Sequence, residues 1–327
     1  MSPRPFLLSI VTPAYRCEAC IEELYRRVVE AVGGIPGASL ELIFVNDGSP
    51  ERDWEVISRL ADLDPRVKGI NLSRNFGQHH AIAAGMDHAQ GDWIAVMDCD
   101  LQDQPEEIPR LFEHAWKEGW DVVFARRMDR QDTWLKVSLS RCFNRLVNTL
   151  STLPIDPAIS NFSIVTRQVA DSYRRMRECS RSYGLGILWC GYKVGYVPVR
   201  HGSRFAGASA YSFGRSLQLA MESITSLSNK PLRMAINLGF GMATLAFLYG
   251  IYLIIRYLFW AIPVAGWTTI TVSLYFLSGV ILVVLGILGL YLGKVFDEVK
   301  ARPIYLVRET RNVDGTPNCD QANGLEA

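Results

Sequence analysis

The sequence WIAVMDCDLQD, residues 93–103, is an apolar run that ends in a group of acidic and amide side chains. We expect residues 93–97 to form a buried strand. Similar apolar runs occur upstream, each followed by polar residues and separated from the next by an amphipathic stretch. Such alternation is typical of a mainly parallel sheet covered by helices, so the sequence predicts an α/β fold.

The expected elements alternate along the chain. Strands are expected at residues 7–12, 40–46, 67–72, 93–97 and 121–125, and helices at residues 19–32, 52–62, 78–88 and 105–117. In such sheets the ligand binds beyond the carboxyl ends of the strands, so the residues after each strand are candidates for a site. No GxGxxG follows the first strand and the sequence contains no GxxxxGK[ST], which argues against dinucleotide dehydrogenases and P-loop NTPases.

Asp98 and Asp100 are the strongest candidates for metal ligands. In an extended segment, residues two apart point the same way, so both carboxylates would lie on one side and Cys99 on the other. Gln102 would add an amide oxygen from the same side. Mg²⁺ and Mn²⁺ prefer oxygen ligands and usually take one or two carboxylates together with substrate phosphate oxygens. Asp-x-Asp also occurs in ordinary solvated turns, but its position directly after a buried strand favours the metal site.

The composition sets limits on partners and on cysteine chemistry. The 327 residues include 34 Lys and Arg against 33 Asp and Glu, a net charge of +1, so no overall field favours a nucleic-acid partner. The 7 cysteines are scattered, and we expect them to be reduced thiols in a protein that faces the cytosol. Cys17 and Cys20 form a CxxC pair without a second pair, which does not favour zinc.

Two long apolar segments lie near the C-terminus. Residues 234–255 and 267–293 contain no charged side chain. Each exceeds the roughly 20 residues that a helix needs to cross a bilayer, so we expect membrane helices at about residues 234–258 and 267–293. Lysines and arginines flank the outer ends, while only Arg256 lies in the connector, so both outer ends are expected in the cytoplasm.

The chain therefore divides into a cytoplasmic α/β domain and a membrane hairpin. The expected parts are the domain at residues 1–212, a juxtamembrane amphipathic helix at 213–230, two membrane helices within 231–295, and a cytoplasmic tail at 296–327. Residues 134–150 read as a basic amphipathic helix suited to an anionic membrane surface. The alternative for both amphipathic helices is that they cover the sheet as core helices.

Four motifs together resemble a known family. SIVTPAY (residues 9–15), VNDGS (45–49), RNFGQ (74–78) and DCDLQ (98–102) are similar to those of the GT-A fold of family 2 glycosyltransferases. More narrowly, the chain resembles the polyprenyl-phosphate glycosyltransferases: dolichyl-phosphate mannose synthases, bactoprenol glucosyltransferases and undecaprenyl-phosphate aminoarabinose transferases. The resemblance implies an inverting, Mg²⁺- or Mn²⁺-dependent transfer of sugar from a nucleotide-sugar donor to polyprenyl phosphate. It also implies a multi-pass protein of the bacterial inner membrane.

The resemblance assigns roles to individual residues. The resemblance implies that the donor nucleotide is bound by Pro13, Ala14, Tyr15 and Asp47. The metal, held against the donor diphosphate, would be bound by Asp98, Asp100 and Gln102. Phosphate oxygens would be bound by Arg127, Arg130 and Arg204. The acid of the family's acceptor-side loop is matched by Asp156. The residues it makes catalytic are Asp98, Asp100, Asp156 and Arg127.

Two departures from the family pattern keep alternatives open, one at Tyr15-Arg16-Cys17, where the family often has Tyr-Asn-Glu, and one at Ala210. Where the family commonly has a lysine, this chain has Ala210, so one phosphate-binding cation is missing. The donor sugar is open, with UDP-glucose as the default, and so is a homo-oligomer. The alternatives are a processive polysaccharide synthase, whose usual Gln-x-x-Arg-Trp is absent from the sequence, and a non-catalytic membrane scaffold or lipid carrier that retains the fold.

Overall fold

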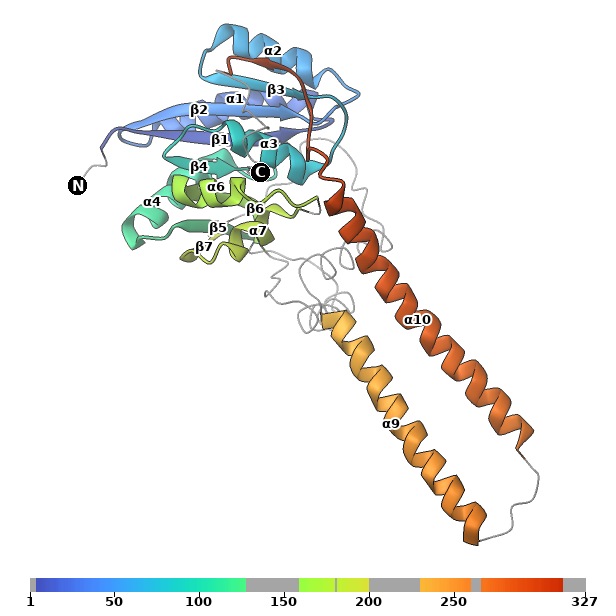
Figure 1. Ribbon diagram of the computed structural model, residues 1–327. Coiled ribbons are helices and arrows are strands. Elements are labelled where there is room, and N and C mark those ends of the chain that lie inside the picture. The colour runs from blue at the N-terminus through green and yellow to red at the C-terminus, as the bar shows by residue number, and fades with distance from the viewer. Residues whose placement is uncertain (1–3, 128–158, 180, 200–229, 260–265, 314–327) are drawn as a thin grey trace, which may run out of the picture. The chain divides into compact units, whose positions relative to one another are not determined.

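The structure is a computed structural model that describes residues 4–127, 159–179, 181–199, 230–259 and 266–313 (Figure 1). These residues fall into two units. The first unit contains a sheet with its covering helices, and the second contains helices α9 and α10. The expected helices at residues 134–150 and 213–230 lie outside the described residues.

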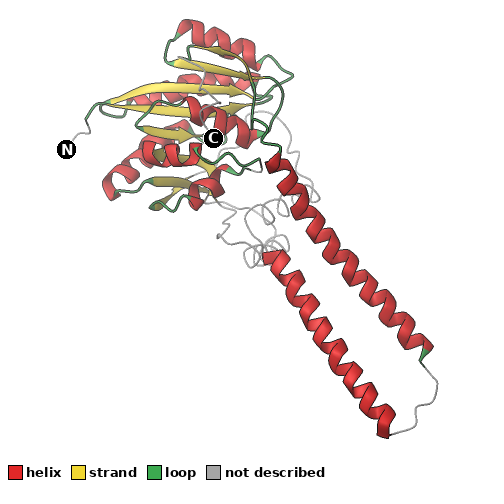
Figure 2. Cartoon of the chain, in the orientation of Figure 1, coloured by secondary structure: helices red, strands yellow, loops and turns green. Residues whose placement is uncertain are grey.

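The first unit is built on an eight-stranded mixed sheet in the order β7-β5-β6-β4-β1-β2-β3-β8. Figure 2 shows the strands in yellow and the helices in red. The strands are β1 (Phe6–Ala14), β2 (Ala38–Asn46), β3 (Val67–Leu72), β4 (Trp93–Val96), β5 (Val122–Arg127), β6 (Ile159–Thr166), β7 (Val194–Val199) and β8 (Val307–Arg311). Strands β6 and β8 run antiparallel to their neighbours, and the other pairs are parallel. The expected mainly parallel α/β sheet is confirmed.

Helices cover both faces of this sheet. They are α1 (Glu18–Gly33), α2 (Asp53–Leu63), α3 (Gln78–His88), the short 3₁₀ helix η1 (Pro105–Glu107), α4 (Ile108–Glu118), α6 (Arg167–Arg174) and α7 (Tyr183–Trp189). One core cluster joins the sheet to α1, α2 and α4, and a second joins it to α3, α6 and α7. The inner strands are buried on both faces, which explains why they read as continuous apolar runs rather than alternating ones.

Helix α3 packs especially close to the sheet. A Cβ atom added at Gly85 would collide with the side chain of Val11 in β1 and lie 3.1 Å from that of Val45 in β2. Gly85 therefore allows the helix to approach both strands. The first residue of α3, Gln78, reaches Asp98 after β4 with its side chain.

The bounds of the predicted strands and helices lie close to the observed ones. The strand at residues 67–72 and the helix at residues 78–88 are confirmed to the residue. The fourth strand ends at Val96, one residue earlier than expected, because the chain turns into the acidic loop. The helix expected at residues 105–117 is divided into η1 and α4, with Pro105 in the first position.

Strand β8 lies within residues 296–327, which were expected to form a tail. It follows the second apolar helix and pairs antiparallel with β3 at the edge of the sheet. The Tyr305 hydroxyl donates to Asp87 Oδ2 at 2.7 Å, and Asn312 Nδ2 donates to the carbonyl oxygens of Ala61 and Val67 at 2.6 and 3.0 Å. The chain thus leaves the sheet unit before α9 and rejoins it after α10.

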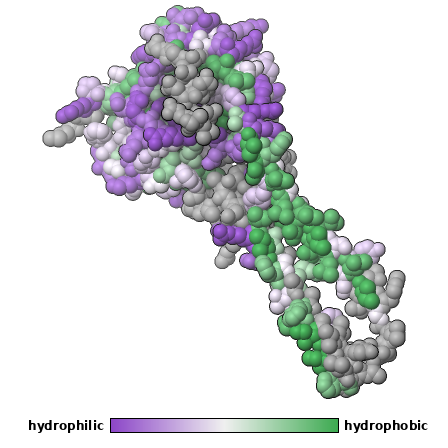
Figure 3. Space-filling model, in the orientation of Figure 1, coloured by the Kyte–Doolittle hydropathy of each residue, from purple (hydrophilic) through white to green (hydrophobic). Residues whose placement is uncertain are grey.

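The second unit contains α9 (Lys230–Phe259) and α10 (Trp267–Val299), of 30 and 33 residues, which contact each other. Both are long and apolar enough to cross a membrane, with apolar windows at Leu232–Tyr249 and Ser273–Val299 of mean hydropathy 1.3 and 2.4. Almost no side chain of either window is buried in protein. Figure 3 shows hydrophobic residues over much of the coloured surface of these helices. The helices therefore lack the burial that core helices would have.

Candidate active site

The ends of four parallel strands meet at one edge of the sheet. Strands β4, β1, β2 and β3 are neighbours, with Ala14 opposite Asn46 and Asn46 opposite Asn71. We call the loops that follow these strands, residues 15–17, 47–52, 73–77 and 97–104, the carboxyl edge. Ligands of open α/β sheets bind at such an edge, and most of the described residues predicted for the site lie on it or next to it.

Asp47 joins two of these loops. Its side chain is buried, and its two carboxylate oxygens accept hydrogen bonds from the backbone N–H groups of Phe76 and Gly77 at 2.7 and 2.9 Å. Burial raises the pKa of Asp47, and the two N–H donors act in the opposite direction. Asp47 therefore holds the loop at residues 73–77 against the end of β2, in addition to the donor role expected from the sequence.

Gly48 is required at the same place. Its φ of +61° lies in the left-handed region, and an added Cβ would lie 2.5 Å from the amide nitrogen of Asn75 and even closer to the backbone of Arg74. Glycine is the residue that tolerates both conditions. The motif Asn46-Asp47-Gly48-Ser49 is thus explained by the close approach of two backbone segments.

Side-chain amides form a second layer beneath the loops. Asn46 Nδ2 donates to Asn71 Oδ1 at 2.9 Å, and Asn46 Oδ1 accepts from the backbone N–H of Ser49 at 3.2 Å. Asn71 Nδ2 in turn donates to Glu309 Oε1 of β8 at 3.2 Å. The unexpected strand β8 therefore supports the carboxyl edge through a chain of three polar side chains.

Tyr15 is the exposed residue of the first motif. Pro13 and Ala14 are buried within β1, whereas Tyr15 is 43% exposed. The Arg16 guanidinium carbon lies 5.5 Å from the centre of the Tyr15 ring, and the Arg16 backbone N–H donates to Ser49 Oγ at 3.1 Å. The edge thus presents an aromatic ring with a cation beside it, a combination suited to stacking against a planar ring.

Asp98 and Asp100 lie at the end of β4, both partly exposed, with Cys99 buried between them. Both carboxylates were expected on one side of an extended segment and Cys99 on the other; the burial alternates in that way, but Cys99 and Asp100 lie in a turn rather than in an extended segment. Asp98 Oδ1 accepts from Gln78 Nε2 at 2.5 Å, and Asp100 Oδ1 accepts from the backbone N–H of Gln102 at 3.1 Å.

Asp103 belongs to the same loop and was not singled out by the sequence analysis. It is 4% exposed, and its Oδ2 accepts from the backbone N–H of Asp98 at 3.4 Å. A carboxylate five residues after Asp98 therefore helps to fold the acidic loop. The sequence contains the run Asp-x-Asp-x-x-Asp, but the role of its third aspartate becomes clear only from the turn that brings Asp103 to the backbone N–H of Asp98.

Cys17 and Cys99 form a disulfide, so the expectation of reduced cysteines is wrong at these two positions. Their Cα atoms are 6.5 Å apart, within the range that a disulfide spans. The residues are 82 positions apart, so sequence spacing gave no reason to pair them. Among the described cysteines, Cys20 and Cys190 are free thiols.

His79, at the start of α3, is held as a neutral ring. Burial lowers the pKa of His79 from 6.5 to about 4, and the nearby His80 adds to the shift. Its Nδ1 lies 3.3 Å from the backbone N–H of Tyr183, which donates to it. The ring therefore links α3 to the start of α7 and does not act as a cation at neutral pH.

The donor set fits a divalent cation that is shared with a ligand. In the part of the chain that the structure describes, no group of three or more His, Cys, Asp or Glu side chains could hold a metal alone. Mg²⁺ and Mn²⁺ sites in phosphate-transferring proteins commonly use one or two carboxylates and take the remaining oxygens from substrate and water. Asp98 and Asp100, two partly exposed carboxylates on one loop, match that chemistry.

The other predicted residues are less well described. Arg127 is the last residue of β5, paired with Val199 of β7. Arg130, Asp156 and Arg204 lie outside the described residues, as does Ala210. The backbone of Gln102 bonds to Asp100, as given above, and its side chain is partly buried. The arginine and acceptor-side roles therefore stay predictions.

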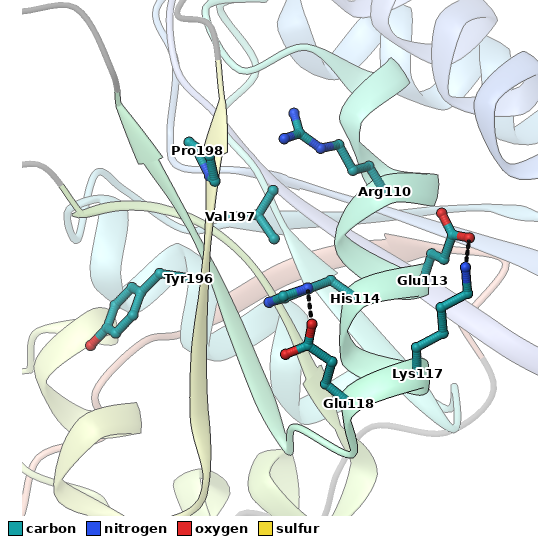
Figure 4. Close-up of a pocket in the computed structure, with 8 residues that line it drawn as sticks. All are labelled: Arg110, Glu113, His114, Lys117, Glu118, Tyr196, Val197 and Pro198. Atoms are coloured by element: carbon teal, nitrogen blue, oxygen red, sulfur yellow. Dashed lines mark hydrogen bonds and ion pairs between the residues drawn. The ribbon is translucent and has the colours of Figure 1, made fainter.

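A separate hollow of about 290 Å³ lies between α4 and β7 (Figure 4). It is lined by Arg110, Glu113, His114, Lys117, Glu118, Tyr196, Val197 and Pro198. Its charged groups are paired, with His114 Nδ1 3.3 Å from Glu118 Oε1, Lys117 bound to Glu113, and Arg110 3.2 Å from Glu107 of η1. None of the residues predicted for the site lines this hollow, so the carboxyl edge remains the candidate.

The fold matches a solved transferase. Glucosyl-3-phosphoglycerate synthase from Mycobacterium tuberculosis, in complex with Mn²⁺, UDP-glucose and phosphoglyceric acid, superposes with a TM-score of 0.50 at 17% sequence identity. The match covers 67% of this chain and 78% of that one. At this identity the comparison shows a shared fold.

Sequence relatives cover nearly the whole chain. An uncharacterized glycosyltransferase of Bacillus subtilis is 38% identical over 307 residues, 94% of each chain. A prophage-derived bactoprenol glucosyl transferase of Shigella flexneri is 37% identical over 305 residues, 93% of this chain and 98% of its own. A prophage bactoprenol glucosyl transferase homolog of Escherichia coli K12 is 35% identical over 306 residues, 93% of this chain and 99% of its own.

These relatives confirm the resemblance inferred from the four motifs. The family model for glycosyl transferase family 2 matches residues 9–178, a span that includes all four motifs and the whole carboxyl edge. The chain belongs to glycosyl transferase family 2.

Proposed function

We propose that this protein is a membrane-bound inverting glycosyltransferase that moves a sugar from a UDP-sugar to a polyprenyl phosphate. The proposal is supported by relatives named bactoprenol glucosyl transferase, which align over 93% of this chain, membrane helices included. UDP-glucose is the favoured donor, because these relatives are glucosyl transferases. The product would be a polyprenyl-phosphate-linked monosaccharide for the modification of cell-surface glycans.

The observation that carries the proposal is the pair Asp98 and Asp100 at the end of β4. Both carboxylates are partly exposed on one loop while Cys99 between them is buried. Asp98, Asp100 and the side chain of Gln102 would hold Mg²⁺ or Mn²⁺ together with the donor diphosphate. When bound there, a divalent cation would offset the negative charge that develops on the leaving nucleoside diphosphate.

The rest of the carboxyl edge suits the donor nucleotide. Tyr15 offers an exposed ring with Arg16 beside it, and the base would stack there. Asp47, Pro13 and Ala14 would define the shape of the nucleotide pocket through their backbone and through the loop that Asp47 holds. The guanidinium groups of Arg127, Arg130 and Arg204 would bind phosphate oxygens, for which a planar fork is well suited.

The acceptor needs little activation. A phosphate monoester is already anionic at neutral pH, so no strong general base is required to make the nucleophile. A phosphate oxygen would attack the anomeric carbon as the bond to the nucleoside diphosphate breaks, with inversion of configuration in a single displacement. Asp156 would orient the acceptor phosphate rather than remove a proton from it.

The apolar helices are proposed to anchor the enzyme where its acceptor lies. At 1.5 Å per residue the 30 residues of α9 and the 33 of α10 extend about 45 and 50 Å, more than the roughly 30 Å of a hydrocarbon core. Because β8 rejoins the sheet after α10, both outer ends of the hairpin would lie on the same side as the transferase unit. The lysines and arginines at these ends favour the cytoplasmic side of the bacterial inner membrane.

The proposal is tested with the full chain in lipid nanodiscs that contain undecaprenyl phosphate. We expect a glucosyl-phospho-undecaprenol of the calculated mass after addition of UDP-glucose and Mn²⁺, and no product when EDTA replaces Mn²⁺. Asp100→Asn should lower the rate at least about 100-fold, because one metal ligand is lost. Asp62→Asn removes one exposed carboxylate from α2 and serves as the matched control, with an unchanged rate.

The same assay discriminates the sugar and the alternative classes. UDP-N-acetylglucosamine and GDP-mannose replace UDP-glucose in parallel reactions, and the product mass identifies the sugar. If no donor yields a lipid product, or if the wild type and Asp100→Asn behave alike, the proposed activity is wrong.

A further inference from the structure

Three cysteines share the apolar core directly beneath the carboxyl edge. Cys17, Cys20 and Cys99 are 6%, 3% and 6% exposed and belong to the same cluster of buried side chains. Cys17 and Cys99 are joined by a disulfide, and Cys20 is a free thiol one helical turn after Cys17. A disulfide therefore lies within the core of the proposed donor site rather than on a peripheral loop.

The bond connects the two loops that carry the main predicted ligands. Cys99 stands between Asp98 and Asp100, and Cys17 follows Tyr15 and Arg16 at the start of α1. The backbone N–H of Cys17 also donates to Asp53 Oδ2 at 3.2 Å, which ties this end to the first residue of α2. The acidic loop is thus linked covalently to Cys17, which is itself held by helix α1 and by Asp53 of α2.

The backbone next to the bond adopts costly conformations. Arg16, the residue before Cys17, has a φ of 55°, and Leu101, two residues after Cys99, has a φ of 60°. Non-glycine residues rarely adopt this region and remain in it only where the surrounding structure holds them. When the bond opens, one of the restraints that holds these two turns is lost, so the acidic loop gains freedom to relax.

We propose that Cys17–Cys99 is a reversible thiol–disulfide site that positions Asp98 and Asp100, so that the affinity for a divalent cation with nucleotide depends on the redox state of this pair. The inference rests on the proposed function of the two aspartates. In the oxidised chain the carboxylates are held for the cation. In the reduced chain they must be ordered by the cation itself, which weakens binding.

The redox step balances with a low-molecular-weight thiol such as glutathione as the reductant. Two glutathione thiols supply two electrons and two protons and become one glutathione disulfide, while the S–S bond of Cys17–Cys99 breaks and each sulfur gains a proton. The reaction proceeds through a mixed disulfide, and the burial of both sulfurs requires the loop to open first. Disulfides in the cytosol of mesophiles are mostly transient, catalytic or redox-sensing, which fits a reversible site.

Thermodynamic linkage provides the test, because a ligand that prefers the oxidised form must make that form harder to reduce. The full chain in detergent is equilibrated in buffers of graded glutathione ratio, alkylated with iodoacetamide, and analysed by mass spectrometry of the peptides containing Cys17 and Cys99. The titration is run with and without Mg²⁺ and UDP, since Mg²⁺ binds thiols poorly. A tenfold preference for the oxidised form lowers the midpoint potential by about 30 mV.

We expect that shift in the wild type and in the control Cys190→Ser, and no shift in Asp100→Asn. Direct titration of Mg²⁺ and UDP should show about tenfold weaker binding to Cys99→Ser and to the reduced wild type, whereas the oxidised wild type and Cys190→Ser bind equally. If the oxidised chain binds Mg²⁺ and UDP but the midpoint does not move, or if the cysteines never pair, the inference is overturned and the proposed function stands. If neither form binds Mg²⁺ and UDP, the proposed function fails, and the coupling with it.

Discussion

Replacing Gly48 by alanine should destabilise the sheet unit more than the same replacement at Gly119. Both glycines have a positive φ, 61° and 69°, so both alanines carry the backbone cost of the left-handed region, about 1 kcal/mol. The surroundings differ. A Cβ at Gly48 would lie 2.5 Å from the amide nitrogen of Asn75, whereas nothing lies within 4 Å of a Cβ at Gly119.

The difference between the two variants isolates the packing of the carboxyl edge. Overpacking a closely packed site costs about 1–3 kcal/mol, and the colliding atoms here are backbone atoms that no rotamer change can move. For a unit of this size, 1 kcal/mol changes the Tm by about 2–4 °C. Gly48→Ala should therefore melt roughly 2–12 °C below Gly119→Ala.

The assay is thermal unfolding of the full chain in detergent, followed by tryptophan fluorescence. Gly119→Ala reports the backbone cost alone, so it is the control for Gly48→Ala. Equal melting temperatures for the two variants would refute the argument that Gly48 is required by the close approach of the loop at residues 73–77.

Three further predictions use the same melting assay. As the pH falls from 6.5 towards 4, the unfolded chain binds a proton at His79 before the folded chain does, because the folded-state pKa is about 4. The free energy of unfolding should therefore fall by roughly 1–3 kcal/mol over this range. His79→Gln should remove that part of the pH dependence. Lys68→Met removes the ammonium group that lies 2.7 Å from the buried carboxylate of Glu41, and should lower the free energy of unfolding by about 3–5 kcal/mol. The double variant with Glu41→Gln should recover part of this loss. An unchanged Tm of the single variant would contradict the prediction. Asn312→Ala removes two hydrogen bonds to the carbonyl oxygens of Ala61 and Val67 and should cost about 1–2 kcal/mol; no loss would mean that these bonds do not hold β8 in place.

The elements that could be predicted are those whose signal is local. The strand at residues 67–72 is a short apolar run, and the helix at residues 78–88 is preceded by Gly77, whose φ is 100°. Neighbouring residues therefore determine where both elements begin. Strand β8, with the sequence VRETR, contains three charged side chains. Its strand conformation depends on pairing with β3, more than 230 residues away, which no local pattern contains.

The candidate site follows the same division. The placement of Asp98 and Asp100 directly after a buried strand was predictable, because it depends on neighbouring residues, whereas the turn at Cys99 and Asp100 was not. The disulfide of Cys99 with Cys17 was not, because the connectivity of cysteines cannot be deduced from spacing. The hydrogen bonds that Asp47 accepts were also hidden, since they come from a loop about 30 residues further along the chain.

Asp98 and Asp100 are proposed to bind a divalent cation together with a nucleoside diphosphate. Titrating the full chain with Mn²⁺ and following free Mn²⁺ by electron paramagnetic resonance measures this directly, with and without UDP. We predict one bound Mn²⁺ per chain whose affinity rises when UDP is present, no such site in the double variant Asp98→Asn/Asp100→Asn, and an unchanged site in Asp62→Asn. Equal Mn²⁺ binding by the wild type and the double variant in the presence of UDP would contradict the account.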